Sequence, residues 1–205
     1  MPSGQSDPLD AVRAAHHQIG NSLQSVVSLL SLESRTAPPE AVGILSEASR
    51  RIRVVMRLHQ RLQEGSGEEV RLDDLLGDVC RDVAELDAMD RDAEIRLDLH
   101  PCTAGSRIAA PLAMITAELV GNALEHGLAQ RPGVVRVSLR PGSDRAVLIV
   151  SDNGVGSEGG EWKPGFGLWL VSRMAGQLGT AVVDQIGPDG SRYEIDCPGV
   201  RANPE

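Results

Sequence analysis

Three short stretches decide the fold: ELVGNALEHG at residues 118–127, SDNGVG at residues 151–156 and GFGLWLV at residues 165–171. The first reads as a turn of helix that presents the side-chain amide of Asn122, a neutral oxygen ligand of the kind that Mg²⁺ takes alongside phosphate oxygens. The second places Asp152 at the end of a strand, where its carboxylate can accept a hydrogen bond from an adenine amino group. In this order, the three stretches predict a site for ATP and Mg²⁺.

The glycines of the second and third stretches suit a loop that folds over a triphosphate. They are Gly154, Gly156, Gly165 and Gly167. Glycine permits backbone conformations and close approaches that a side chain would block. An isolated Asp-x-Gly-x-Gly is often only a tight turn after a strand. The prediction therefore depends on the order of a helix with an asparagine, a strand with this motif, and a Gly-x-Gly that opens a helix.

This arrangement resembles the Bergerat-type ATPase domain of the GHKL superfamily over roughly residues 70–198. The resemblance implies an α/β sandwich that holds ATP between helices and a mixed sheet. It also implies that Glu118, Leu168 and Ser191 contribute to nucleotide binding, with Ser191 supplying a small hydroxyl near the adenine. Because the superfamily includes histidine kinases, anti-sigma-factor kinases, topoisomerases and a chaperone, it does not say what receives the phosphate.

The first 65 residues predict a long helix with one apolar stripe. Apolar side chains recur at alternating spacings of three and four, and the series skips only position 16. They are Leu9, Val12, Ile19, Leu23, Val26 and Leu30. Helix geometry then puts His16 on the seam and turns His17 about 100° away, onto a polar face. An exposed imidazole, mostly neutral near pH 7, is a competent nucleophile toward a phosphoryl group.

The run HQIGNSLQSVVSLLSLESR, residues 17–35, resembles the phosphoacceptor helix of the histidine-kinase subgroup whose signature reads HRVKNNLQ. Asn21, Leu23 and Gln24 fall on signature positions only if His17 is the acceptor. The resemblance implies a kinase that phosphorylates itself on His17 and passes the phosphoryl group to an aspartate of a response-regulator receiver domain. Asn21 lies four residues later, where its amide can orient water for dephosphorylation of the regulator.

A second helix is expected over residues 40–64, after the break at residues 36–39. Its predicted facing stripe consists of Leu45, Ala48, Ile52, Val55 and Leu62. Its other side carries Arg50, Arg51, Arg53, Arg57 and Arg61. We interpret this charged side as a solvated face rather than a docking surface. Because a two-helix hairpin has only one partner for a long apolar stripe, we predict a homodimer joined through a four-helix bundle.

The predicted architecture is α+β with two domains. Residues 1–66 form the dimerisation and histidine-phosphotransfer hairpin, and residues 67–205 form the ATP-binding catalytic domain. A Gly-Ser-Gly hinge at residues 65–67 lets the ATP-binding domain swing toward His17. Strands are expected at residues 69–72, 94–99, 134–139, 146–151, 181–186 and 191–197. Helices are expected at residues 73–88, 110–130 and 166–178.

Composition narrows the setting. The chain has 205 residues and a formal net charge of -9, which argues against general nucleic-acid binding because that needs a basic face. No uninterrupted apolar run reaches the roughly 18 residues of a membrane span, and the N-terminus has no secretory pattern. We therefore expect a cytoplasmic protein without a membrane span. Cys80, Cys102 and Cys197 lack metal-ligand or paired spacing, so we expect reduced thiols.

Three features depart from the kinase pattern. Gln18 follows His17 where many histidine kinases have an acidic residue, Glu125 stands where a lysine often faces phosphate, and residues 157–164 are short for an ATP lid. These departures leave open a dimeric histidine phosphotransferase that relays phosphate between receivers without using ATP. The run GLWLV at residues 167–171 also resembles anti-sigma-type serine kinases, which would need no histidine.

Overall fold

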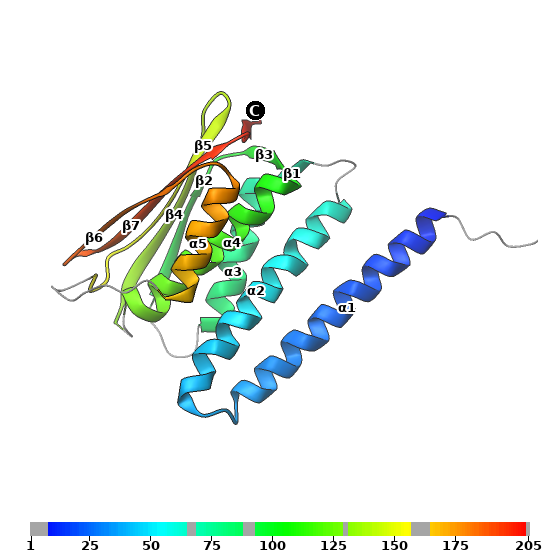
Figure 1. The fold of residues 1–205 in the computed structure, drawn as a ribbon, viewed down its shortest axis with the longest axis horizontal. Helices are drawn as coiled ribbons and strands as arrows, with labels where there is room; N and C mark the ends of the chain where they lie inside the picture. Colours follow the sequence, from blue (N-terminus) through cyan, green and yellow to red (C-terminus); the bar gives the residue numbers. More distant parts are fainter. Residues whose placement is uncertain (1–7, 65–68, 88–92, 129–130, 157–164, 204–205) are drawn as a thin grey trace, which may run out of the picture.

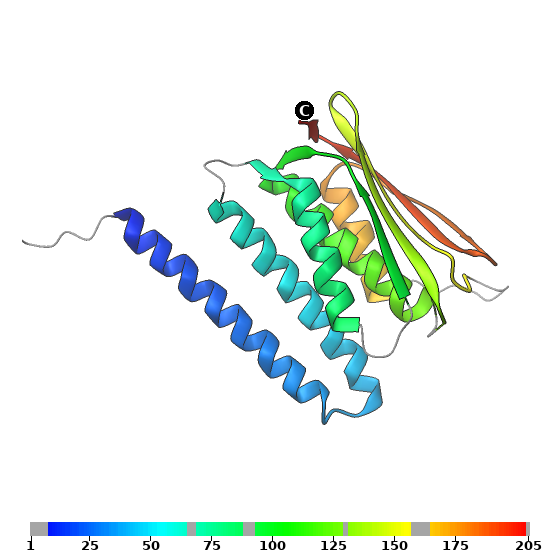
Figure 2. The same cartoon turned by 180° about the vertical axis from the view of Figure 1, so that it is seen from behind.

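The computed structural model describes residues 8–64, 69–87, 93–128, 131–156 and 165–203, with side chains in the helical hairpin from residue 18 to residue 61. Its elements form successive layers (Figure 1). The outermost is helix α1 (Pro8–Ser34), and α2 (Pro39–Glu64) packs beneath it. Helices α3, α4 and α5 come next, and they cover one face of a β-sheet, as the reverse view confirms (Figure 2). The predicted α+β fold is confirmed.

Helices α1 and α2 form the predicted antiparallel hairpin. Proline suits the first position of α2, and Glu40 in the first turn favours the helix dipole. On α1, Val27 is buried, whereas four large apolar side chains of the predicted stripe and its neighbours are exposed. These are Ile19, Val26, Leu29 and Leu32. The hinge at residues 65–67 and the side chains of His16 and His17 lie outside what the structure describes.

The solvated-face interpretation of α2 is wrong, and part of its predicted apolar stripe is wrong as well. Val55 is exposed, while Val54 and Arg50 are buried. The arginines pair with acidic residues of α3, α4 and the turn that follows α4, because α2 lies against α3 and α4. The pairs are Arg50 with Glu125, Arg51 with Glu118, Arg57 with Asp82 and Arg61 with Asp78.

The large sheet is mixed, as predicted. Its strand order is β2–β4–β5–β7–β6, with β2 parallel to β4 and the remaining neighbours antiparallel. The strands are β2 (Ala93–Leu99), β4 (Gly133–Pro141), β5 (Arg145–Asp152), β7 (Gly190–Pro198) and β6 (Val182–Gly187). A second, small sheet joins β1 (Glu69–Arg71) to β3 (Cys102–Gly105) and β3 to β8 (Arg201–Ala202). Strands β3 and β8 were not expected from the sequence.

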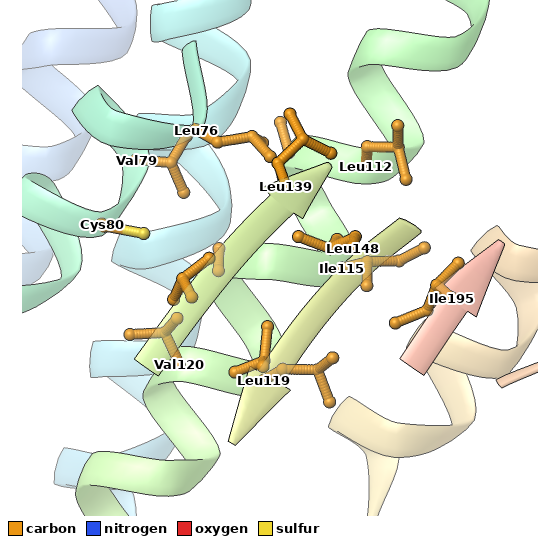
Figure 3. Packing of buried hydrophobic residues seen from close by; sticks show 14 of the residues in the cluster. Leu76, Val79, Cys80, Leu112, Ile115, Leu119, Val120, Leu139, Leu148 and Ile195 are labelled. Carbon is orange, nitrogen blue, oxygen red and sulfur yellow. The ribbon is translucent and has the colours of Figure 1, made fainter. Parts of the chain in front are cut away.

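The hydrophobic core lies between this sheet and helices α3 (Leu72–Asp87), α4 (Ser106–Asn122) and α5 (Phe166–Gln177). Figure 3 shows Leu76 of α3 and Leu112 of α4 packing toward Leu139 and Leu148 of the strands. Side chains alternate in and out along β5, so that every second residue is buried. Asp152 is the last of this buried series. The alternation therefore places a carboxylate at the end of the core, facing the helices.

Helix α4 begins at Ser106, four residues before the expected start, with Pro111 inside it. It continues into a π-helical turn, η1 (Ala123–Gly127), in which the Leu128 N–H donates to the Ala123 carbonyl. Among the described residues, Ser106–Gly127 is the one helical stretch long and apolar enough to cross a membrane by length and composition. However, 72% of it is buried inside the protein, as expected for a core helix.

The three cysteines are free and buried, as the reduced-thiol prediction requires. Burial raises the pKa of the Cys80 and Cys197 thiols to about 12 and that of Cys102 to about 11. All three are therefore protonated and unreactive near neutral pH.

Candidate functional site

The three motif stretches meet in one cleft of about 370 Å³. The end of α4 with η1, the end of β5, and the start of α5 form its walls. Seven of the predicted nucleotide-binding residues line it: Asn122, Asp152, Gly156, Gly165, Gly167, Leu168 and Ser191. Gly154 lies against the Asp152 carboxylate, and Glu118 is buried beneath Gly167. Asn21 lies on α1 and is not among the described residues that line the cleft, and the side chain of His17, on the same helix, lies outside what the structure describes.

Asp152 is held in place by two donors. Its Oδ1 accepts a hydrogen bond from the Gly154 N–H at 2.9 Å, and its Oδ2 accepts one from the Ser191 hydroxyl. Only 9% of Asp152 is exposed, so its carboxylate has a fixed orientation at the cleft wall. Burial raises the pKa of Tyr193, which also lines the cleft, so its hydroxyl stays neutral.

Two glycines in the loop after β5 are required by their surroundings. A Cβ on Gly154 would lie 1.9 Å from the Gly127 carbonyl oxygen, which also accepts a hydrogen bond from the Val155 N–H at 2.9 Å. Gly156 has a φ of 53°, and a Cβ there would lie 1.7 Å from the Gly187 carbonyl oxygen. The loop is thus fitted tightly between η1 and the β6–β7 turn, which shapes the mouth of the cleft.

Replacing Gly154 with alanine is expected to destabilise the protein by about 1–3 kcal/mol, because the methyl group would push the loop away from the Gly127 carbonyl. Urea unfolding of the whole chain measures the change. Gly176→Ala is the matched control: the position is an exposed one inside α5, and no atom lies within 4 Å of the new Cβ. This control should gain about 0.5–1 kcal/mol. Equal stability of the Gly154 variant and the parent would contradict the close fit.

The start of α5 meets the last turns of α4. A Cβ on Gly167 would lie 2.9 Å from Glu118 Oε2 and 3.5 Å from the side-chain amide atoms of Asn122. Gly165 precedes α5 and provides no side-chain cap. The first N–H groups of α5, like those of any helix, have no intrahelical partner. They lie at the cleft, and so does the positive end of the helix dipole. Such a helix end binds phosphate oxygens.

The π-helical turn carries two residues with distinct surroundings. His126 is exposed and lines the cleft. Glu125 pairs with Arg50 of α2, whose Nη1 lies 3.2 Å from Glu125 Oε1. The carboxylate that stands where a lysine often faces phosphate is therefore paired with a buried arginine. No sequence signal indicated the π turn, although such turns are frequent at functional sites.

The residues present fit Mg²⁺ and ATP. The cleft offers the Asn122 amide, free helix N–H groups and glycine-lined walls that a Cβ would obstruct. Within the described parts of the chain, no cluster of three or more His, Cys, Asp or Glu side chains could hold a metal ion by itself. A metal at Asn122 would therefore share its coordination with phosphate oxygens, which suits Mg²⁺.

Comparisons with known proteins agree with this geometry. Residues 15–87 match the HisKA_2 family, described as histidine kinase. Sensor histidine kinase PdtaS of Mycolicibacterium smegmatis is 31% identical over 198 residues, which cover 91% of this chain and 37% of that protein.

The chain carries a sensor histidine kinase core.

PdtaS of Mycobacterium tuberculosis is 29% identical to this core over 189 residues. That match covers 87% of this chain, which spans about 38% of the length of that relative. One similar solved structure is the histidine kinase domain of the Erythrobacter litoralis EL346 blue-light activated histidine kinase, with a TM-score of 0.69 and 18% sequence identity. The match covers 86% of this chain and 96% of that one. The ATP-binding domain of PrrB from Mycobacterium tuberculosis has a TM-score of 0.52 at 26% identity, covering 64% of this chain and 96% of that one.

His17, the predicted phosphoacceptor, and the cleft lie at different positions along the helical hairpin. At a rise of about 1.5 Å per residue, His17 lies about 25 Å along α1 from the hairpin turn. Glu47, the α2 residue that lines the cleft, lies only about 12 Å along α2 from the same turn. The cleft and the backbone of His17 are therefore offset by about 13 Å along the hairpin.

Proposed function

We propose that this chain is the core of a two-component histidine kinase that transfers the γ-phosphoryl group of ATP to His17 and then to an aspartate of a response regulator. The observation that carries the proposal is the convergence of Asn122, Asp152 and Gly167 in one cleft. The same chain supplies the hairpin that matches the histidine kinase family. We assign residues 1–66 to dimerisation and phosphotransfer and residues 67–205 to ATP binding.

In this proposal each wall of the cleft has one task. Asp152 accepts a hydrogen bond from the adenine amino group, and Ser191 orients that carboxylate through its own hydrogen bond. Glycines 165 and 167 leave room for phosphates at the free N–H groups of α5. Asn122 offers an oxygen to Mg²⁺, which when bound spreads the negative charge of the phosphates.

The transfer itself needs little chemistry from the protein. A neutral imidazole nitrogen of His17 attacks the γ-phosphorus in line, the bond to the β–γ bridging oxygen breaks, and ADP leaves with that electron pair. The proton of the resulting imidazolium passes to water, since Gln18 provides no carboxylate base. A regulator aspartate then attacks the phosphohistidine, and His17 is regenerated. Asn21 is exposed on α1, where its amide can orient a water molecule that hydrolyses the phosphoaspartate of the regulator.

A second copy of the chain completes the helical bundle in this proposal. The exposed apolar side chains of α1, among them Ile19, Leu29 and Leu32, form a face that the hairpin alone does not cover. Burial of this face against its equivalent in another copy would give a four-helix bundle.

Acid treatment after incubation with γ-labelled ATP tests the proposed function. A phosphohistidine kinase should retain label in base and lose it in acid, whereas a serine kinase would retain label in acid. A phosphate relay would take no label from ATP, although it would accept label from a phosphorylated receiver domain. Label that survives acid, or a failure to take label from ATP, would contradict the proposal. Binding of Mg·ADP, measured by calorimetry on the same preparation, shows whether the cleft is competent.

A further inference from the structure

Arg51 of α2 reaches across from the hairpin into the nucleotide site. Its Nε lies 2.8 Å from Glu118 Oε1, and its Nη2 lies 2.9 Å from Glu118 Oε2, so the two side chains form a two-pronged ion pair. The same Nη2 lies 2.8 Å from Oε2 of Glu47, which lines the cleft. One face of α2 is thus part of the cleft wall, although α2 belongs to the helical hairpin.

Glu118 depends on this partner. It is fully buried, and every hydrogen bond described for its carboxylate comes from Arg51. It lies one helical turn before Asn122 on the same side of α4, and its Oε2 is 2.9 Å from the Cβ position of Gly167. A buried carboxylate without a counter-charge would therefore lie directly beneath the end of α5 to which we assign the phosphates.

Arg51 also contacts the start of α5 itself. Its guanidinium carbon lies 4.9 Å from the centre of the Phe166 ring, a cation–π distance. Phe166 is the first residue of α5, lines the cleft, and is 60% exposed. Its ring centre lies 5.2 Å from that of Trp169. The guanidinium therefore covers an aromatic side chain at the helix end that faces the cleft.

We propose that Arg51 is a positioning residue of the nucleotide site. Its guanidinium cancels the charge of Glu118 and fixes the Phe166 ring. The site therefore reaches full nucleotide affinity only when α2 is docked. The inference rests on the proposed function, because it concerns the same cleft. It makes the hairpin part of nucleotide binding. By thermodynamic linkage, nucleotide then strengthens the docking of α2 by the same factor.

Arg57 provides the matched control. It forms a two-pronged pair with Asp82 at 2.6 Å for both bonds, on the same docking surface of α2. Asp82 belongs to α3 and is not among the residues that line the cleft. Arg57→Gln therefore removes a comparable docking contact without changing the surroundings of Glu118 or Phe166.

The test measures the Kd of Mg·ADP by calorimetry on the whole chain. Arg51→Gln should raise this Kd by about tenfold, because the uncompensated Glu118 repels the phosphates. Arg51→Lys should give a smaller rise, since lysine keeps the charge but not the planar fork. Adding Glu118→Gln to Arg51→Gln should lower the Kd again by about threefold relative to Arg51→Gln alone, because the uncompensated charge is then removed. Arg57→Gln should leave the Kd within about twofold.

Trp169 provides a second readout. Because the chain has two tryptophans, Trp162→Phe leaves Trp169 as the single fluorophore. In that background Arg51→Gln should change the Trp169 emission, because Arg51 contacts the Phe166 ring next to Trp169, whereas Arg57→Gln should not, because Arg57 pairs with Asp82 of α3.

An unchanged Kd in Arg51→Gln, or no recovery in the double variant, would overturn the inference while leaving the proposed function intact. An equal loss in Arg57→Gln would also overturn it, since the effect would then come from docking in general. Failure of the parent to bind Mg·ADP would overturn the proposed function and this inference with it. Circular dichroism checks folding, and if Arg51→Gln does not fold, Arg51→Lys compared with Arg57→Lys decides by the same criterion.

Discussion

A chain that carries His17→Gln is expected to take up no acid-labile label from γ-labelled ATP while its Kd for Mg·ADP stays within about twofold of the parent. Glutamine keeps a polar side chain of similar length at this position of α1, but its amide nitrogen has no free lone pair for attack on phosphorus. The residues described as lining the cleft include none from α1, so nucleotide binding should be preserved. Gel autoradiography with acid and base washes measures the label, and calorimetry measures the affinity.

His16→Gln is the control for this substitution. His16 precedes His17 by one residue, and the sequence pattern predicts that it lies about 100° around the helix axis from His17, on the apolar seam. The control should keep most of its label. Loss of label in His16→Gln with retention in His17→Gln would show that the register of the acceptor helix is wrong by one residue. Retention of label in both variants would place the acceptor elsewhere in the chain.

The cleft was predictable because its parts are local. Asp152 ends a strand with alternating apolar residues, and this period of two sends it to the buried face of the sheet. Gly154 and Gly156 follow as turn residues whose close contacts exclude any side chain. Asn122 lies on an apolar helix that must face the core. Each of the three motif stretches spans ten residues or fewer, and their order brings them to one edge of the sheet.

The role of the α2 arginines was not predictable in the same way. An arginine-rich helix face has the same sequence whether it meets water or acidic side chains. The acids that decide between the two, Asp78, Asp82 and Glu118, lie on α3 and α4, which are separate from α2 in the sequence. Gly121 gives a further indication only in hindsight, because a Cβ there would lie 1.9 Å from Arg50 Nη1. Its missing side chain provides the space that the buried arginine occupies.

Short and irregular elements were missed for a different reason. Strands β3 and β8 have only four and two residues, too few for an alternation to be recognised. The helix expected from residue 110 begins at Ser106 instead, so Pro111 lies inside α4, where it removes one backbone hydrogen bond. Burial of most of α4 in the core stabilises the helix enough to offset that loss.

Asp152→Asn is expected to weaken the binding of Mg·ADP by about hundredfold. The carboxylate is an acceptor at both oxygens, one of which takes the Gly154 N–H at 2.9 Å and the other the Ser191 hydroxyl. An amide has one oxygen and one N–H₂ group. If the oxygen stays with Gly154, the N–H₂ group replaces the acceptor beside Ser191 and meets the adenine amino group, which is also a donor. If the amide turns around, it opposes the Gly154 N–H and displaces the loop. Either arrangement loses the hydrogen bond that orients the base.

The matched control is Asp144→Asn, which changes the charge of the chain by the same amount. Asp144 is exposed in the turn before β5, at the opposite end of that strand from Asp152. Its Kd for Mg·ADP should stay within about twofold of the parent, because a single exposed charge at this distance is screened by salt. Circular dichroism should show both variants folded, since the buried apolar residues of β5 are unchanged. If Asp152→Asn bound Mg·ADP as tightly as Asp144→Asn, the base would have to be held by other groups of the cleft. The assignment of Asp152 to adenine would then be wrong, even though the cleft itself binds nucleotide.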